Sequence, residues 1–286
     1  MLGENTVRKL GIEVFYWLAN WSDDQTSVFG RAKANGCDVV EVSLIDGGET
    51  DTARFRSELD RHALDVCCSL GLPADKDITS ADEATRRAGI IYLKQCVDAA
   101  ARLGSPILGG LPHVPWLHFP AERDLRPYRE RSANAMREVA SYASDHGVTL
   151  CVEIINRFET YIFNTVAEAL DYLALVDHPN LKLQLDTYHM NMEEANLAAA
   201  IVAAGARLGH FHCTDSNRRL PGGGHIQWGP IKAALDQVGY TGPLVMETFP
   251  NPNAETGRAV NVWRPLAQDY DGELRAALAL LRSQVA

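Results

Sequence analysis

Four short apolar runs in the second half of the chain each carry, at or near their C-terminal end, a side chain of the kind that binds metal ions. The runs are VTLCVE, LKLQLD, RLGHFHC and PLVMETF, and the four side chains are those of Glu153, Asp186, His212 and Glu247. Successive positions are separated by roughly 26 to 35 residues, close to the ~31 residues of one strand–helix unit when about 250 residues form eight units. Neighbouring parallel strands with this spacing would present all four side chains at one end of a sheet.

A single acidic residue at a strand end is most often a solvated loop residue or a helix cap, but four at matched spacing are a stronger signal. Side-chain alternation supports the grouping, because Lys182, Gln184 and Asp186 share one face of their strand and the intervening leucines share the other. Three carboxylates and one imidazole form an oxygen-rich site that suits Mn²⁺, Co²⁺ or Mg²⁺ better than a thiol-selecting metal. We therefore expect one divalent metal ion as the cofactor.

The rest of the chain alternates strand and helix signals. Apolar strand-like runs also occur at 9–17, 37–44, 64–72 and 105–112. Helical periodicity follows the strands at 23–35, 52–62, 81–103, 123–146, 165–176, 193–204, 228–238 and 265–283, with Ser80 as the expected cap of the third helix. Eight alternations predict an α/β protein with parallel strands, and at 286 residues they favour a closed (β/α)₈ TIM barrel over a doubly wound sheet. No Pro/Gly/Ser-rich or charged linker divides the chain, so we expect residues 1–286 to form a single domain.

Composition and charge exclude several classes of protein. The net charge of −10 argues against a nucleic-acid or membrane partner, and no signal peptide or run of about 18 apolar residues occurs, so a cytoplasmic protein is expected. The six cysteines include no CxxC pair, which predicts reduced and buried thiols. Neither GxGxxG nor GxxxxGK(S/T) is present, which disfavours nicotinamide and P-loop nucleotide binding.

Six segments carry a resemblance to a known family. They are CVEIINRFET (151–160), LQLDTYHMNMEE (183–194), GHFHCTDSNRR (209–219), PGGGHIQW (221–228), VMETF (245–249) and GRAVNVWR (257–264). Together they resemble the D-tagatose/D-psicose (allulose) 3-epimerases, which are ketose 3-epimerases of the xylose-isomerase-like TIM barrel superfamily. The match follows nearly the whole chain in order and is strongest from 151 to 264. The wider superfamily shares the metal residues but not the combined INRFE, DTYHMN and SNR segments, so the resemblance is specific.

The resemblance implies roles for individual residues. The metal ligands would be Glu153, Asp186, His212 and Glu247, with Glu153 and Glu247 also acting as the catalytic acid/base pair on opposite faces of the sugar. The substrate-binding residues would be Glu159, His189 and Arg218 at the O1 to O3 end of a ketose, together with Trp116 and Phe249 as apolar walls. Phe15, Trp17 and Trp21 stand at approximately the family's N-terminal aromatic positions. The family also implies a homodimer or homotetramer.

Simpler interpretations exist for the polar residues of this set. Glu159 could pair with the nearby Arg157, His189 could cap a helix that begins near Met192, and Arg218 could belong to a solvated loop with Arg219. His210, one layer below His212 on the same strand face, is interpreted as structural.

The expected reaction is inversion at C3 of a free ketohexose or ketopentose, such as D-tagatose, D-fructose/D-psicose or L-ribulose. A metal ion that polarises the C2 carbonyl favours removal of the C3 proton, and an enediolate reprotonated from the other face by a second carboxylate has the inverted configuration. The alternative enzyme is an aldose/ketose isomerase of the hydroxypyruvate isomerase type, which would move hydrogen between C1 and C2. A three-zinc abasic-site endonuclease would need more histidine ligands and a basic groove. A catalytically inactive sugar-binding barrel is the non-enzyme alternative.

Overall fold

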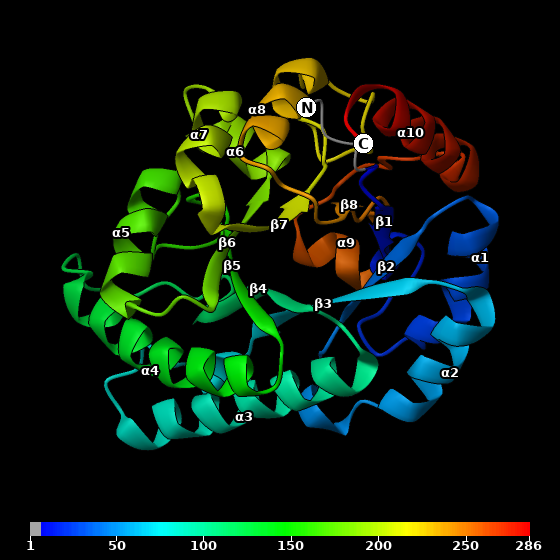
Figure 1. The fold of residues 1–286 in the computed structure, drawn as a ribbon. Helices are drawn as coiled ribbons and strands as arrows, with labels where there is room; N and C mark the ends of the chain where they lie inside the picture. Colours follow the sequence, from blue (N-terminus) through cyan, green and yellow to red (C-terminus); the bar gives the residue numbers. More distant parts are fainter. Residues whose placement is uncertain (1–6) are drawn as a thin grey trace.

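The computed structural model describes residues 7–286 as a closed barrel of eight parallel strands inside a ring of helices (Figure 1). The strands are β1 Leu10–Glu13, β2 Val39–Ser43, β3 Asp65–Leu72, β4 Ile107–Pro115, β5 Thr149–Ile154, β6 Leu181–Asp186, β7 Leu208–His212 and β8 Leu244–Met246. Each strand pairs with its neighbour in sequence, and β1 pairs with both β2 and β8, which closes the ring. The predicted (β/α)₈ barrel is confirmed.

Helices connect successive strands around the barrel, and two more helices follow β8. They are α1 Phe29–Ala34, α2 Thr52–His62, α3 Glu83–Leu103, α4 Arg126–Asp145, α5 Val166–Val176, α6 Thr187–Glu193, α7 Leu197–Ala204, α8 Trp228–Gln237, α9 Glu255–Ala259 and α10 Tyr270–Gln284, with 3-10 turns η1 Val14–Tyr16, η2 Gln25–Val28, η3 Gly47–Glu49, η4 Ala74–Lys76 and η5 Gly205–Arg207. Local sequence sets several boundaries. Thr165 and Glu168 form a capping box at the start of α5, and Gly104 ends α3 with a φ of 76°.

Several sequence-based boundaries are wrong. The first strand ends at Glu13 rather than residue 17, because the Glu13 carboxylate accepts a hydrogen bond from the Phe15 backbone and starts η1. The cap of α3 is Asp82, whose side chain accepts from the Thr85 backbone at 2.8 Å, whereas Ser80 Oγ only accepts from the Asp82 backbone at 3.1 Å. Asp82 is favoured because its carboxylate lies at the N-terminal end of the helix dipole.

The predicted helix 193–204 corresponds to α7, which begins only at Leu197, and the separate helix α6 before it was not predicted. α6 begins directly after β6, since Asp186 caps it by accepting from the Tyr188 backbone at 2.7 Å. The chain then turns extended at Glu194, and Asn196 caps α7 by accepting from the Ala199 backbone at 3.0 Å. The short α9 was not predicted. These caps show that polar side chains at the end of β6 and before α7, rather than the spacing of apolar residues, determine where the two helices begin.

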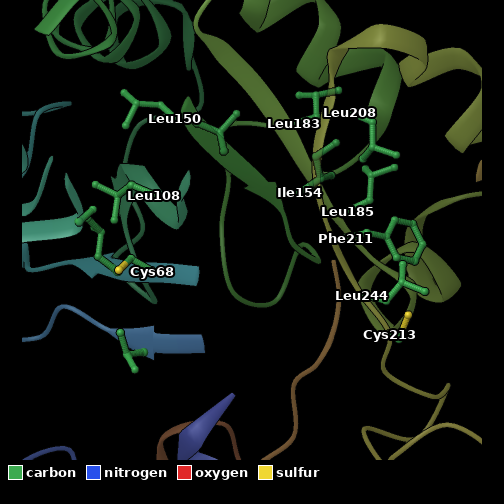
Figure 2. Close-up of a cluster of buried hydrophobic side chains, with 14 of the residues drawn as sticks. Cys68, Leu108, Leu150, Ile154, Leu183, Leu185, Leu208, Phe211, Cys213 and Leu244 are labelled. Atoms are coloured by element: carbon green, nitrogen blue, oxygen red, sulfur yellow. The ribbon is translucent and has the colours of Figure 1, made fainter. Parts of the chain in front are cut away.

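The barrel wall separates an apolar exterior from a layered interior. Leu150, Leu183, Leu185, Leu208 and Phe211 are buried on the outer faces of their strands, in the hydrophobic cluster between strands and helices (Figure 2). Inside the barrel, a small apolar cluster forms the lower layer and consists of Val39, Cys67, Ile107 and Cys151. Polar side chains at 41, 184 and 210 lie buried above it. Because side chains alternate between the two faces of each strand, the inward-facing polar groups gather toward one mouth of the barrel.

All six cysteines are buried and unpaired, as predicted, and Cys213 lies in the outer apolar cluster (Figure 2). Across residues 7–286, no helix combines the length and apolar character needed to cross a bilayer.

Candidate active site

The barrel mouth brings the four predicted ligands together. Glu153 lies on β5, Asp186 ends β6, His212 ends β7 and Glu247 directly follows β8. His212 Nδ1 lies 3.6 Å from Glu153 Oε1 and 3.9 Å from Glu247 Oε2. One side-chain atom from each of Glu153, Asp186, Glu247 and His189 falls within 4.8 Å of the others, so this group of four contains His189 and not the predicted ligand His212.

The electrostatics of the carboxylates fit a divalent cation. Burial and the nearby Glu247 carboxylate raise the pKa of Glu153 well above its ordinary value. Burial raises the pKa of Asp186 to about 6, with Glu247 adding to the rise and Arg218 and His212 opposing it. Glu153 Oε1 is buried and has no hydrogen-bond partner within residues 7–286. A cation at this point would relieve the like-charge repulsion and satisfy the unpaired oxygen, which is the behaviour of a hard-metal site.

Hydrogen bonds assign different roles to the two histidines. His212 Nε2 lies 3.1 Å from Glu41 Oε1, and a carboxylate can only accept, so Nε2 carries the hydrogen and the lone pair of Nδ1 faces Glu153 and Glu247. His189 Nδ1 instead accepts from the backbone N of Asn156 at 3.2 Å and lies 2.8 Å from its Nδ2. His189 therefore presents Nε2–H to the cavity, which suits a donor to a sugar oxygen rather than a metal ligand.

Burial would lower the pKa of His212, but Glu41, Glu153 and Glu247 raise it well above its ordinary value. A proton on Nδ1 and a cation would compete for the same position. Burial, Arg218 and His212 lower the pKa of His189, which keeps that ring neutral.

Glu41 on β2 is a site residue that the sequence did not reveal. Both of its oxygens are engaged, Oε1 by His212 and Oε2 by His210 Nε2 at 2.6 Å, and all three side chains are essentially inaccessible to solvent. Burial would raise the pKa of Glu41, but the two imidazoles lower it below its ordinary value, so the group is ionised. The signal that could have found it is a charged residue inside the apolar run VVEVS, on the inward face. His210 is structural, as interpreted from the sequence.

Glu13, at the end of β1, was also missed. It is buried, and burial together with Glu247 and Glu41 raises its pKa. Its Oε2 accepts from the Phe15 backbone at 2.7 Å, while Oε1 has no partner in the part of the chain described.

Arg218 is buried and bridges two of the acidic residues, so the solvated-loop interpretation is wrong. Its Nη1 donates to Asp186 Oδ2 at 3.0 Å and its Nη2 to Glu247 Oε2 at 2.7 Å. The guanidinium also lies over the rings of Tyr188 and Phe249, at 4.7 and 5.6 Å from their centroids. The backbone of Arg218 has a φ of 63°, an unfavourable conformation for a residue with a side chain, and Thr248 Oγ1 donates to its carbonyl. Neighbouring Arg219 pairs instead with Glu273 at 3.3 Å.

Asp186 divides its two oxygens between different partners. Oδ1 accepts from the Tyr188 backbone and thereby caps α6, the helix that carries His189, while Oδ2 accepts from Arg218.

Glu159 and Trp116 hold each other in the cavity wall. Trp116 Nε1 donates to Glu159 Oε2 at 3.0 Å, and Asn156 Nδ2 donates to Glu159 Oε1 at 2.8 Å. The alternative ion pair with Arg157 is wrong, because Arg157 pairs with Glu193 at 2.6 Å. His189 lies inside α6 and does not cap a helix near Met192.

A cavity of about 290 Å³ opens above this cluster. Its lining includes every predicted site residue except Asp186, which lies fully buried beneath, and also includes Trp21. The other two N-terminal aromatic residues, whose roles the sequence indicated only approximately, do not line this cavity. Phe15 packs against Trp21 with ring centroids 4.8 Å apart, and Trp17 lines a different cavity with Arg31 and Tyr270. The described residues therefore form one acidic, partly aromatic pocket at the C-terminal mouth of the barrel.

Comparison with known proteins identifies the family to which this chain belongs. The profile of the family described as xylose isomerase-like TIM barrel matches residues 29–266. The chain is 32% identical over 283 residues to a D-psicose 3-epimerase from Agrobacterium fabrum, covering 96% of this chain and 98% of that enzyme. It is 35% identical over 278 residues to an L-ribulose 3-epimerase from Methylomonas sp., covering 96% of each. The chain belongs to the ketose 3-epimerases.

This ketose 3-epimerase also shares its three-dimensional structure with solved relatives. A crystal structure of a D-psicose 3-epimerase in the presence of D-fructose matches it with a TM-score of 0.92 at 33% identity, covering 97% of this chain and 99% of the other. The predicted family, and with it the isomerase class, is confirmed.

Proposed function

We propose that this protein reversibly inverts C3 of a free ketohexose or ketopentose, with D-tagatose, D-fructose/D-psicose and L-ribulose as candidate substrates. The observation that carries the proposal is the pair of glutamates, Glu153 on β5 and Glu247 after β8, which face one small cavity from strands that are not neighbours in the barrel. Relatives that cover nearly the whole chain are named D-psicose 3-epimerase and L-ribulose 3-epimerase, which supports this substrate class.

The two glutamates act as the proton carriers. One carboxylate removes the C3 proton and the other returns a proton from the opposite side, so that the configuration inverts. The raised pKa of Glu153 suits a group that must hold a proton during part of the cycle. Arg218 and His189 donate to the oxygens at the O1 to O3 end of the sugar, and Glu159 accepts from a hydroxyl there. Trp116 and Phe249 exclude water from the cavity.

Glu153, Asp186, His212 and Glu247 would hold one divalent ion, which we propose to be Mn²⁺, with Co²⁺ and Mg²⁺ as alternatives. When bound, such an ion supplies Lewis-acid polarisation of the substrate carbonyl. His189 is excluded from this ligand set because its Nδ1 is taken by Asn156.

Turnover in D₂O tests the reaction. After incubation of the Mn²⁺-loaded enzyme with D-psicose or L-ribulose, NMR should find deuterium at C3 of both the substrate pool and the epimer. The isomerase alternative predicts exchange at C1 or C2 with an aldose as the main product. An aldose with no exchange at C3 would refute the proposal, whereas absence of any turnover would favour a sugar-binding barrel.

We further propose that residues 1–286 act as one domain and that copies of the chain associate as a homodimer or homotetramer. Large apolar side chains at the surface, Phe158 at 71% and Trp263 at 82% exposure, support an interface between copies. Light scattering coupled to size exclusion would measure the mass, and a 31.4 kDa particle would exclude association.

A further inference from the structure

The cavity has a second polar feature, on the side of the barrel opposite the sugar-holding residues. Ser43 ends β2 and pairs in register with Ser69 on β3, and their hydroxyl oxygens lie 3.2 Å apart. Both serines line the same cavity as Glu153 and Glu247. In a ring of eight strands, β2 and β3 lie across from β6 and β7 (Figure 1), which lead into His189 and Arg218.

The serine pair lies in otherwise apolar surroundings. The ionisable side chains in the described cavity lining come from β5 to β8 and the segments that follow them: Glu153, Glu159, His189, His212, Arg218 and Glu247. Around the serines, the lining consists of Ile45, Leu70, Gly71, Pro73 and Leu111. A side chain at Gly71 would meet nothing within 4 Å, so this end of the cavity is open space. A sugar held at its O1 to O3 end by Arg218 and His189 would extend its tail toward this end.

The two hydroxyls have unused hydrogen-bonding capacity. Each serine hydroxyl offers one hydrogen and two lone pairs, and their mutual bond uses one hydrogen. Within residues 7–286 neither hydroxyl bonds to any other protein group, so one donor and several acceptor positions remain for a ligand.

The pair is also held rigidly. The Gln25 side chain makes two hydrogen bonds to the backbone of Ser43: Nε2 donates to the Ser43 carbonyl at 2.8 Å, and Oε1 accepts from the Ser43 N–H at 3.0 Å. The Ser69 carbonyl accepts from the Leu44 backbone at 2.8 Å. A preorganised polar pair binds a ligand group with less loss of entropy than a mobile one.

We propose that the Ser43–Ser69 pair binds the terminal hydroxyl of a six-carbon ketose, and so makes this enzyme prefer free ketohexoses over ketopentoses and terminally deoxygenated sugars. This inference rests on the proposed function and names the substrate class of the same site. Among the described residues, no lysine or arginine lines this end of the cavity, so a terminal phosphate would lack a counter-charge there.

The test compares three substrates on four proteins. Wild type, Ser43→Ala, Ser69→Ala and the double variant are assayed as Mn²⁺-loaded enzymes on D-psicose, 6-deoxy-D-psicose and L-ribulose. Ser283→Ala, at an exposed position of α10, is the matched control. We expect each serine variant to lower kcat/KM for D-psicose roughly 2- to 10-fold, mainly through KM, the usual effect of one hydrogen bond. The other two sugars should change less than twofold.

The double variant should resemble the single ones, because either substitution disrupts the pair. An equal loss on all three sugars, or no loss on any, would overturn the inference, as would a wild-type preference for the five-carbon sugar. These outcomes are distinct from failure of the proposed function, in which wild type converts none of the ketoses. Melting temperatures of the variants identify any general effect on folding.

Discussion

Replacing Glu41 by leucine should weaken metal binding although Glu41 does not face the cavity. The carboxylate keeps the hydrogen of His212 on Nε2, at 3.1 Å, and so leaves Nδ1 free toward Glu153 and Glu247. Leucine has a similar volume but no acceptor, so the ring loses its partner and is free to place the hydrogen on Nδ1, the nitrogen that faces the ion site.

Removing a carboxylate that orients a ligating histidine costs about 10- to 100-fold in metal affinity. That range is about 1.4–2.8 kcal/mol, which agrees with the roughly 1.5–3 kcal/mol of one hydrogen bond to a charged group. Glu41→Gln is the matched variant. Its single acceptor can face His212 while the amide faces His210, whose Nδ1 has no partner in the described chain and can take the hydrogen instead. We expect Glu41→Gln to lose less than about tenfold.

Titration calorimetry of the metal-free proteins with Mn²⁺ measures the affinities, and ¹⁵N shifts of the His212 ring report which nitrogen carries the hydrogen. Glu138→Gln, on the surface, controls for loss of a carboxylate. A folded Glu41→Leu protein with affinity within twofold of wild type would refute the orienting role. Equal losses in the leucine and glutamine variants would show that charge, rather than the hydrogen bond, is what matters.

Three further predictions follow from the described contacts. Chelation with EDTA should abolish turnover, and full activity in EDTA would contradict this prediction. Mn²⁺ at 100 times its Kd should restore turnover and stabilise the fold by about 2.7 kcal/mol, seen as a higher melting temperature. Burial lowers the pKa of His113 to about 3, so stability should fall as pH drops from 6.5 toward 3, when only the unfolded chain takes up the proton. His113→Phe should remove about 2 kcal/mol of that loss at pH 5, measured by urea unfolding, and an unchanged pH profile would count against it. Gly89→Ala should destabilise the protein by about 1 kcal/mol or more, because the added carbon would lie 2.1 Å from the Lys76 carbonyl oxygen. The control Gly229→Ala, whose added carbon has no described atom within 4 Å, should be neutral or stabilising. Equal melting temperatures for the two variants would contradict this prediction.

The fold was predictable because its signals are local. Strand parity placed Asp186 inward and the leucines of β6 outward, and the expected helices 81–103 and 165–176 end and begin where the structure has the Gly104 turn and the Thr165 cap. The strand-end positions of Glu153 and Glu247 followed from the same spacing. Each of these inferences needs only the local pattern of one strand–helix unit or the spacing between successive units.

The missed features depend on which strands meet across the closed ring. Glu41 is about 170 positions from His212 in sequence, and only ring closure puts it beneath that imidazole. A charged residue in a strand is ordinarily expected to face solvent, so Glu13 and Glu41 gave no sign of their partners. The pairing of Ser43 with Ser69 likewise depends on strand register, which hydrophobic pattern alone does not fix.

The divided carboxylate of Asp186 has a thermodynamic consequence. One oxygen caps the helix that carries His189 and the other accepts a hydrogen bond from Arg218, so whatever fixes this carboxylate also fixes the start of α6. An ion would therefore order part of the sugar site before any sugar arrives. Linkage makes such an effect reciprocal: the factor by which the ion tightens sugar binding equals the factor by which the sugar tightens ion binding. Under scarce metal, substrate itself would then help the enzyme to retain its cofactor.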